Sequence, residues 1–99
     1  MAVDVATLGG RLRIAATHAS LPGHFPGDPI VPGVVLLDHV AASLERAGFT
    51  LAKLSAVKFL APLRPDEDAV LRFEGDARRL RFRIERDDNP ILAGEATLA

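Results

Sequence analysis

Residues 33–48 read Gly-Val-Val-Leu-Leu-Asp-His-Val-Ala-Ala-Ser-Leu-Glu-Arg-Ala-Gly. No proline interrupts this stretch, and Gly48 stands where a helix commonly ends in a left-handed cap, so the stretch predicts a helix over 34–47. Its first two turns are apolar on nearly all sides, through Val34, Val35, Leu36, Leu37, Val40, Ala41 and Ala42. Such a helix needs cover on most sides, and we therefore expect other elements to bury it.

The segments on both sides of the helix have the two-residue period of β-strands. Before it, Leu12, Ile14 and Ala16 alternate with polar residues and predict a first strand. After it, four runs at 51–60, 69–74, 79–85 and 91–98 are separated by turn-rich breaks. The order predicts an α+β fold in a single domain over residues 1–99, in which a curved antiparallel sheet of about five strands wraps one helix and the last four strands form a meander.

Composition narrows the class of protein. Of the 99 residues, 48% are hydrophobic and 25% are charged, which is the balance of a folded domain, and the net charge of -1 gives no general attraction to nucleic acid or to an anionic membrane. The chain has no cysteine, no apolar run near the roughly 18 residues of a membrane span, and no signal-like start. We therefore expect a cytoplasmic protein without a membrane or nucleic-acid partner. A chain this short buries only about two-thirds of its unfolded surface, which favours an oligomer.

The loop before the helix is rich in proline and glycine. Residues 22–33 read Pro-Gly-His-Phe-Pro-Gly-Asp-Pro-Ile-Val-Pro-Gly. Pro26-Gly27 fits the centre of a type II turn and should hold the chain stiffly beside His24. Gly33 lets a substrate approach the free amides and the positive end of the helix dipole, which suits an oxygen that gains negative charge. Asp38 lies about 7.5 Å further along the axis among apolar neighbours, where burial would favour its protonated form and make it a proton donor.

The loop and the helix acid together resemble a known family. The string His24-Phe-Pro-Gly-Asp-Pro-Ile-Val-Pro-Gly33, with an acid at Asp38, is similar to the 3-hydroxyacyl-[acyl carrier protein] dehydratases (FabA/FabZ-like) of type II fatty acid synthesis. Residues 57–65 resemble that family's strand and following turn, so the resemblance covers about residues 11–98. The motif is specific because it fixes ten residues and an acid at a set spacing. It implies a hotdog fold, a homodimer or an oligomer of dimers with sheets joined edge to edge, and active sites between subunits.

The resemblance also implies the chemistry, which is dehydration of a 3-hydroxyacyl thioester to the trans-2-enoyl thioester on acyl carrier protein or coenzyme A, without metal or cofactor. His24 matches the catalytic base, Asp38 the acid, and Gly33 the amide that holds the thioester carbonyl, and in the family the histidine of one subunit meets the acid of the other. A histidine near neutral pKa suits removal of the Cα proton. The residues expected to contact substrate are Phe25, Pro26, Gly27, Ile30, Val31, Pro32, Val34 and Phe59.

Three positions depart from the larger subgroup of the family. Asp38 stands where most members have glutamate, Ala42 where glutamine is usual, and His39 where alanine is usual. The aspartate resembles the subgroup that also isomerises the double bond, and the departures indicate a short specialised branch, such as ApeI-like dehydratases of aryl polyene or polyketide synthesis. Two other functions stay open: an acyl thioesterase that works with a helix carboxylate and water, and a non-catalytic subunit that binds acyl chains or a partner.

Several side chains have competing interpretations. His24 and Asp38 could be a turn histidine and an interfacial carboxylate, and Gly33 could simply start the helix. A metal site from His18, His24, His39 and Asp38 is disfavoured because no recognised ligand spacing appears. An arginine cluster on the outward side of two strands could dock an acidic carrier protein, chiefly through Arg78, Arg79 and Arg81, although a solvated face balanced by Glu74, Asp76 and Glu85 is the favoured interpretation.

Overall fold

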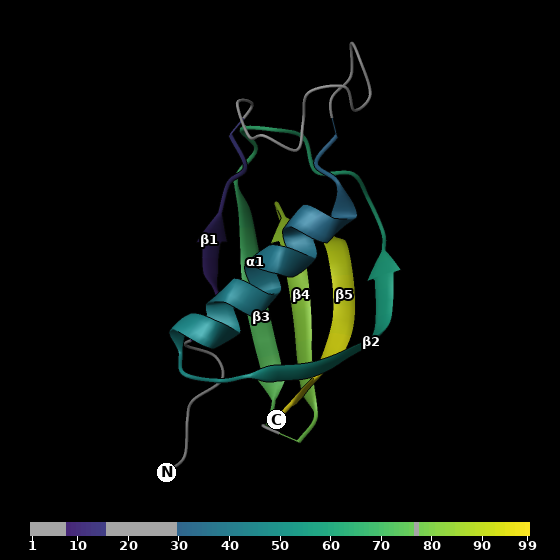
Figure 1. The fold of residues 1–99 in the computed structure, drawn as a ribbon. Coiled ribbons are helices and arrows are strands. Elements are labelled where there is room, and N and C mark those ends of the chain that lie inside the picture. The colour runs from purple at the N-terminus through teal and green to yellow at the C-terminus, as the bar shows by residue number, and fades with distance from the viewer. Residues whose placement is uncertain (1–7, 16–29, 77) are drawn as a thin grey trace.

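The computed structural model describes residues 8–15, 30–76 and 78–99. Within them, one helix lies across a five-stranded antiparallel sheet (Figure 1). In chain order the elements are β1 (Gly10–Leu12), α1 (Gly33–Arg46), β2 (Leu51–Phe59), β3 (Ala69–Gly75), β4 (Leu80–Arg86) and β5 (Asn89–Leu98). The predicted fold class is confirmed. No helix among these residues is long and apolar enough to cross a membrane.

The strand order in the sheet is β1-β3-β4-β5-β2. The predicted meander is correct for β3, β4 and β5, but it is wrong for β2, which pairs with β5 at one edge of the sheet and not with β3. The free side of β3 is taken instead by β1, through the pairs Gly10↔Leu71 and Leu12↔Ala69. The helix carries the chain across the face of the sheet before β2 begins (Figure 1), so β2 returns on the β5 side.

The helix ends as its sequence predicts. Gly48 has a φ of +90°, the left-handed conformation that glycine adopts without steric cost. The amide of Phe49 donates to the Leu44 carbonyl at 3.0 Å and the amide of Gly48 donates to the Glu45 carbonyl at 3.0 Å. This pair of bonds is the Schellman arrangement, which satisfies carbonyls that the last helical turn leaves open.

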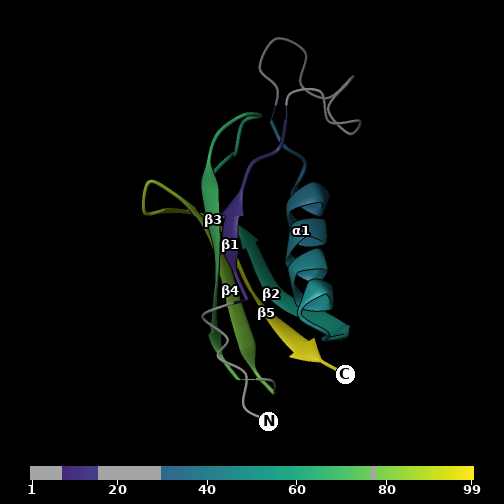
Figure 2. The same cartoon turned by 90° about the vertical axis from the view of Figure 1, so that its left-hand side faces the viewer.

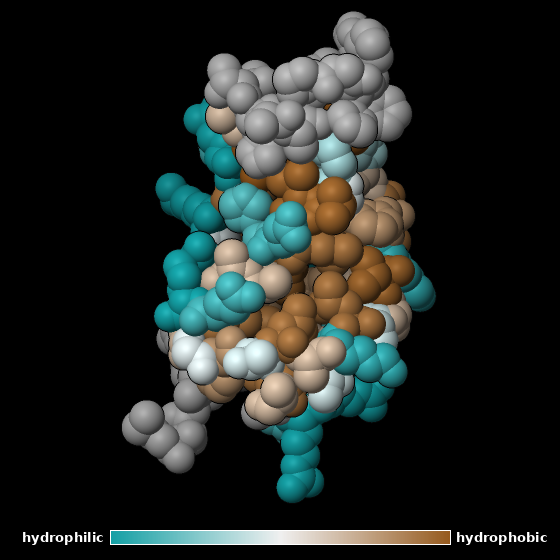
Figure 3. Space-filling model, viewed as in Figure 1, coloured by the Kyte–Doolittle hydropathy of each residue, from teal (hydrophilic) through white to brown (hydrophobic). Residues whose placement is uncertain are grey.

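The sheet covers only one side of α1 (Figure 2). Val35, Leu36, Val40 and Leu44 are buried against it, whereas Val34 is 63% exposed. The expectation that the helix is covered on most sides is therefore wrong for a single chain. Five strands of this length curve over one face of the helix and leave the opposite face without cover. Figure 3 shows hydrophobic surface gathered over α1 and toward β2.

Strand β4 shows the predicted alternation. Leu80, Phe82 and Ile84 point into the core and are at most 2% exposed, while Arg81 and Arg83 are exposed on the other face of the sheet. The first strand is shorter than predicted, because pairing ends at Leu12, although Ile14 beyond it is still buried. Ala16, the third predicted inward residue of that strand, lies outside the described residues.

Strand β2 is bent at a bulge. Ser55 pairs with Glu95 and Lys58 pairs with Ala93, so two residues of β2 lie opposite one of β5, and Ala56 has a φ of +51°. Bulges of this kind bend a strand and increase its twist. The bend turns the end of β2 upward along β5 (Figure 1), and Phe59 thereby reaches the start of α1, where its ring lies against Gly33.

Candidate active site

The structure places the predicted site residues in three groups. His24, Phe25, Pro26 and Gly27 lie outside the described residues, as does His18. Gly33 and four of the five predicted substrate contacts that the structure describes lie around one cleft at the start of α1. Asp38 and the arginines Arg78, Arg79 and Arg81 do not line that cleft.

The cleft has a volume of about 580 Å³, within the range of sites that bind small molecules. Five of its ten lining residues were predicted as site residues, namely Ile30, Val31, Pro32, Gly33 and Phe59. The sequence analysis missed the other five lining residues, which are Leu36 and a wall formed by residues 60–63 (Leu, Ala, Pro, Leu). A signal for that wall was present, since residues 60–63 fall within the 57–65 segment that resembles the dehydratase family. The predicted contact Val34 is not among the lining residues.

The start of α1 forms part of this apolar cleft, through Pro32, Gly33 and Leu36. Pro32 occupies the N-cap position, and within the described residues no side chain caps the helix and no acidic residue lies in its first turn. The amide of Val35 bonds back to the Pro32 carbonyl at 3.0 Å. The positive end of the helix dipole is thus directed at a site lined mainly by hydrocarbon, where it can stabilise developing negative charge on a substrate oxygen.

A side chain at position 33 would require the Phe59 ring to move. A Cβ added there would lie 2.6 Å from Cζ of Phe59 and would contact Cε1 as well. Phe59 is 58% exposed and Leu60 is 51% exposed, so both extend the apolar surface from the cleft to the outside of the molecule. Access to the Gly33 amide therefore depends on the absence of a side chain at this residue and on where the Phe59 ring lies.

Replacing Gly33 with alanine is expected to lower kcat/KM for a thioester substrate by about tenfold or more, because the new methyl group displaces the Phe59 ring and narrows the approach to the amide. Gly10→Ala is the matched control, since a Cβ there meets no atom within 4 Å. The values of kcat/KM are measured by steady-state kinetics on both variants, and circular dichroism verifies that they are folded. Wild-type kinetics in Gly33→Ala would contradict the placement of substrate at this amide.

Asp38 is exposed in the single chain, so the burial expected from its apolar neighbours is not provided by the chain itself. It lies one turn after Val34 on the side of α1 that the sheet does not cover. The apolar neighbours predicted from the sequence are real, but with the sheet on one side only they do not enclose the carboxylate. A second molecule against this side of the helix would be needed to desolvate it.

His39, the one histidine among the described residues, is half-buried in a second cleft, between α1 and β1. That cleft has a volume of about 520 Å³ and is also lined by Arg11, Ser43 and Arg46. Among the residues that the structure describes, no three His, Cys, Asp or Glu side chains form a group that could hold a metal ion.

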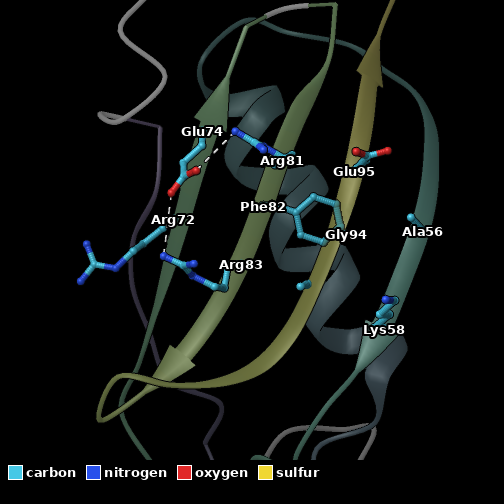
Figure 4. A pocket seen from close by; sticks show the side chains of 10 residues that line it. Ala56, Lys58, Arg72, Glu74, Arg81, Phe82, Arg83, Gly94 and Glu95 are labelled. Atoms are coloured by element: carbon cyan, nitrogen blue, oxygen red, sulfur yellow. Dashed lines mark ion pairs between the residues drawn. The ribbon is translucent and has the colours of Figure 1, made fainter.

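The outward arginines are paired with carboxylates. Arg81 lies 3.6 Å and Arg83 lies 3.9 Å from carboxylate oxygens of Glu74 on β3 (Figure 4), and Arg83 also contacts Glu85 at 2.6 Å. Arg72 pairs with Glu85 at 3.3 Å. These pairs surround a shallow hollow of about 340 Å³ on the face of the sheet opposite α1. The balanced charged face favoured from the sequence agrees with these pairs.

Two further arginines belong to the turn between β3 and β4. The backbone N–H groups of Arg79 and Arg78 donate to Asp76 Oδ1 at 3.1 and 2.9 Å, and these bonds hold the pKa of the Asp76 carboxyl below its usual value. The Arg79 guanidinium pairs with Glu95 at 3.1 Å. This turn lies at the opposite end of the sheet from the start of α1 (Figures 1 and 2).

The antiparallel sheet, its single helix and the cleft at the helix N-terminus define a hotdog-fold protein, and solved structures agree. A chain of the dehydratase heterocomplex ApeI:P from Xenorhabdus doucetiae matches with a TM-score of 0.74 and 30% identity, over 92% of this chain and 85% of that one. An uncharacterized protein from Erwinia carotovora subsp. atroseptica matches with a TM-score of 0.71 and 26% identity, over 92% and 81%.

The sequence assigns the family within this fold. The family model described as ApeI dehydratase (ApeI-like) matches residues 2–95, and the chain belongs to this ApeI-like dehydratase family. The 3-hydroxyacyl-[acyl-carrier-protein] dehydratase FabZ of Chloroflexus aggregans is 30% identical over 97 residues, and that of Syntrophobacter fumaroxidans is 32% identical over 81 residues. The alignments cover 88% and 71% of this chain but only 61% and 55% of the relatives. The chain thus spans little more than half the length of these curated relatives.

Proposed function

We propose that the protein removes water from a 3-hydroxyacyl thioester to give the trans-2-enoyl thioester, with His24 as base and Asp38 as acid. The observation that carries this proposal is the apolar cleft at the start of α1, which Gly33 lines together with residues 30–32. These residues complete the His24 motif, so the position that resembles the family's carbonyl-binding amide lies in a cavity suited to an acyl chain. Membership in the ApeI-like family supports the same reaction class.

The reaction divides between three groups. The imidazole of His24 takes the proton from Cα, and the electron pair of that bond forms the Cα–Cβ double bond. The Gly33 N–H and the helix dipole stabilise the thioester oxygen while enolate character grows. The C–O bond at Cβ breaks as protonated Asp38 delivers its proton to the departing hydroxyl, which leaves as water. The His24 imidazolium then releases its proton to solvent and the Asp38 carboxylate takes one up, which restores the starting protonation state of the site.

The proposed acid comes from a second subunit. Asp38 is exposed in the single chain and does not line its own cleft, and the uncovered side of α1 adjoins apolar surface at Val34, Phe59 and Leu60. Docking a second hotdog chain on this side would cover that surface and desolvate the carboxylate. Strand β2 is an edge of the sheet and can continue pairing into another sheet.

We expect the purified protein to be a dimer at micromolar concentration, because the uncovered helix face and the sheet edge are too apolar to remain in water. Light scattering after size exclusion measures the mass directly. A measured mass equal to that of one chain would contradict the homodimer. Because a similar chain belongs to the ApeI:P heterocomplex, a second arm of the experiment adds another ApeI-like dehydratase chain and measures whether a mixed dimer forms.

We further propose that the substrate is carried by an acyl carrier protein. The FabZ relatives support this, because they are 3-hydroxyacyl-[acyl-carrier-protein] dehydratases. An Arg79→Glu, Arg81→Glu pair is expected to slow turnover of the carrier-bound substrate more than that of a coenzyme A analogue, because reversed charge weakens attraction to an acidic carrier. The kinetics of the double variant on both substrates test this. Equal effects on the two would leave these arginines with only their ion pairs to Glu95 and Glu74.

One assay tests the function as a whole. The purified protein is incubated with 3-hydroxyacyl carrier-protein and coenzyme A thioesters of several chain lengths, and the products are separated by mass. Formation of the enoyl thioester would support dehydratase activity. Free acid would instead indicate a thioesterase, and unchanged substrate that remains bound would indicate a non-catalytic acyl-binding subunit.

A further inference from the structure

The wall of the cleft belongs to a connection that holds several parts of the chain together. Residues 60–68 join β2 to β3 at the same end of the sheet as the start of α1 (Figure 1). The amides of Leu60 and Ala61 donate to the Ile91 carbonyl at 2.8 and 3.3 Å, and the Leu63 side chain is 1% exposed. The first part of this connection is therefore fixed to β5 and to the core.

The same connection bonds to both flanks of residues 16–29, the stretch that contains His24. On the downstream side, the Val31 amide donates to the Leu63 carbonyl at 2.8 Å, two residues before Gly33. On the upstream side, the Asp66 amide donates to the Ile14 carbonyl at 2.8 Å, and Arg13 donates to the Asp66 carbonyl from Nε and Nη2 at 2.9 and 2.6 Å. The position of residues 60–68 thus sets where both flanks are held.

Arg86, at the end of β4, bonds to this connection at two places. Its Nη1 donates to the Pro62 carbonyl at 2.8 Å and to Glu67 Oε1 at 3.0 Å, which one guanidinium nitrogen can do because it carries two hydrogens. Glu67 Oε1 also accepts the Arg64 amide at 2.7 Å. The side chains of Arg86 and Glu67 are 24% and 33% exposed, so water screens this pair less than the ion pairs on the outer face.

We propose that Arg86 and Glu67 are positioning residues for the cleft. Their contact fixes Pro62, and through Leu63 and Val31 it holds the chain that enters α1 at Gly33. Neither residue is among those that line the cleft. This role rests on the proposed function, in which the Gly33 amide receives the thioester oxygen. The pair would affect catalysis by holding that amide in position.

Arg86→Met tests the role, since methionine keeps part of the apolar stem and removes both donated bonds. Amide hydrogen exchange followed by NMR is expected to accelerate about tenfold or more at Val31 and Leu60, because the segment opens more often without the contact to Pro62 and Glu67. Arg86→Lys, whose ammonium still donates, is expected to restore much of the protection. Arg46→Met is the matched control, because the hydrogen bond that Arg46 donates within the described residues goes to Ser43 Oγ near the far end of α1.

Kinetics on the thioester that the wild type turns over separate positioning from stability. Loss of folded protein would lower kcat and leave KM unchanged, whereas a displaced cleft wall and amide should lower kcat about tenfold and raise KM together. Unchanged exchange at Val31 in Arg86→Met overturns the proposal, and so does faster exchange with wild-type kcat and KM. If the wild type turns over no 3-hydroxyacyl thioester, the proposed function fails, and the exchange comparison by itself decides whether Arg86 holds this segment.

Discussion

Replacing His24 with alanine is expected to lower the rate of dehydration by about a hundredfold or more, because positioned general bases contribute rate factors of at least that size. Among the described residues, the Val31 amide bonds to the Leu63 carbonyl and the Val35 amide bonds to the Pro32 carbonyl, and neither bond uses the imidazole. The variant should therefore keep the fold and the oligomeric state of the wild type. Steady-state turnover on the substrate identified in the product assay gives the comparison.

His18→Ala is a suitable control for this experiment, because it removes a histidine from the same stretch of sequence without changing the motif. We expect it to retain most of the wild-type rate. Full activity in His24→Ala, with folding and oligomeric state verified, would remove His24 from the reaction and leave it as a residue of the turn.

Replacing Asp38 with asparagine is expected to abolish most of the activity, by about a hundredfold or more, because an amide keeps the shape of the carboxyl but cannot deliver a proton to the leaving hydroxyl. Asp38 is exposed in the single chain, so the substitution should not disturb the core. If His24 and Asp38 act as one unit, the double variant should be little slower than either single variant. Wild-type turnover in Asp38→Asn would end the assignment of this residue as the acid.

A mixing experiment tests whether the two groups come from different subunits. Inactive His24→Ala and Asp38→Asn proteins are combined under conditions that allow subunit exchange. A mixed dimer with sites between the subunits contains one site with both groups intact and should regain part of the activity. Each variant mixed with itself is the control. If mixing restores nothing although mixed dimers form, His24 and Asp38 of the same chain must serve the same site.

Local features of the sequence were enough to predict the elements of this fold. The helix could be placed within one residue at each end, because its limits depend on the Pro32-Gly33 entrance and on the left-handed Gly48. The inward positions Leu80, Phe82 and Ile84 followed from the two-residue period of a strand. Each of these properties depends on backbone conformation or on residues close in the chain, and so can be recognised without the tertiary structure.

Other features depended on contacts between distant residues. A period of two identifies β2 as a strand but does not say which strand it joins, and its place beside β5 depends on the path that α1 takes across the sheet. The apolar first turns of α1 predicted burial, yet one sheet covers only one side, which left Val34 and Asp38 exposed. The sequence alone therefore predicted an acid in an apolar environment, while the tertiary structure showed that the chain's own core does not provide that environment.

The candidate site, like the fold, could be predicted from the sequence only in part. The sequence by itself was enough to identify the motif with His24, the glycine at the helix entrance, the acid at Asp38 and the resemblance to a dehydratase family. These features depend only on residue type and spacing. The tertiary structure decided that residues 60–63 line the cleft and that Arg86, 24 residues from Pro62, donates a hydrogen bond to the Pro62 carbonyl. Contacts over such separations are selected by the packing of the whole chain, and no local pattern of residues encodes them.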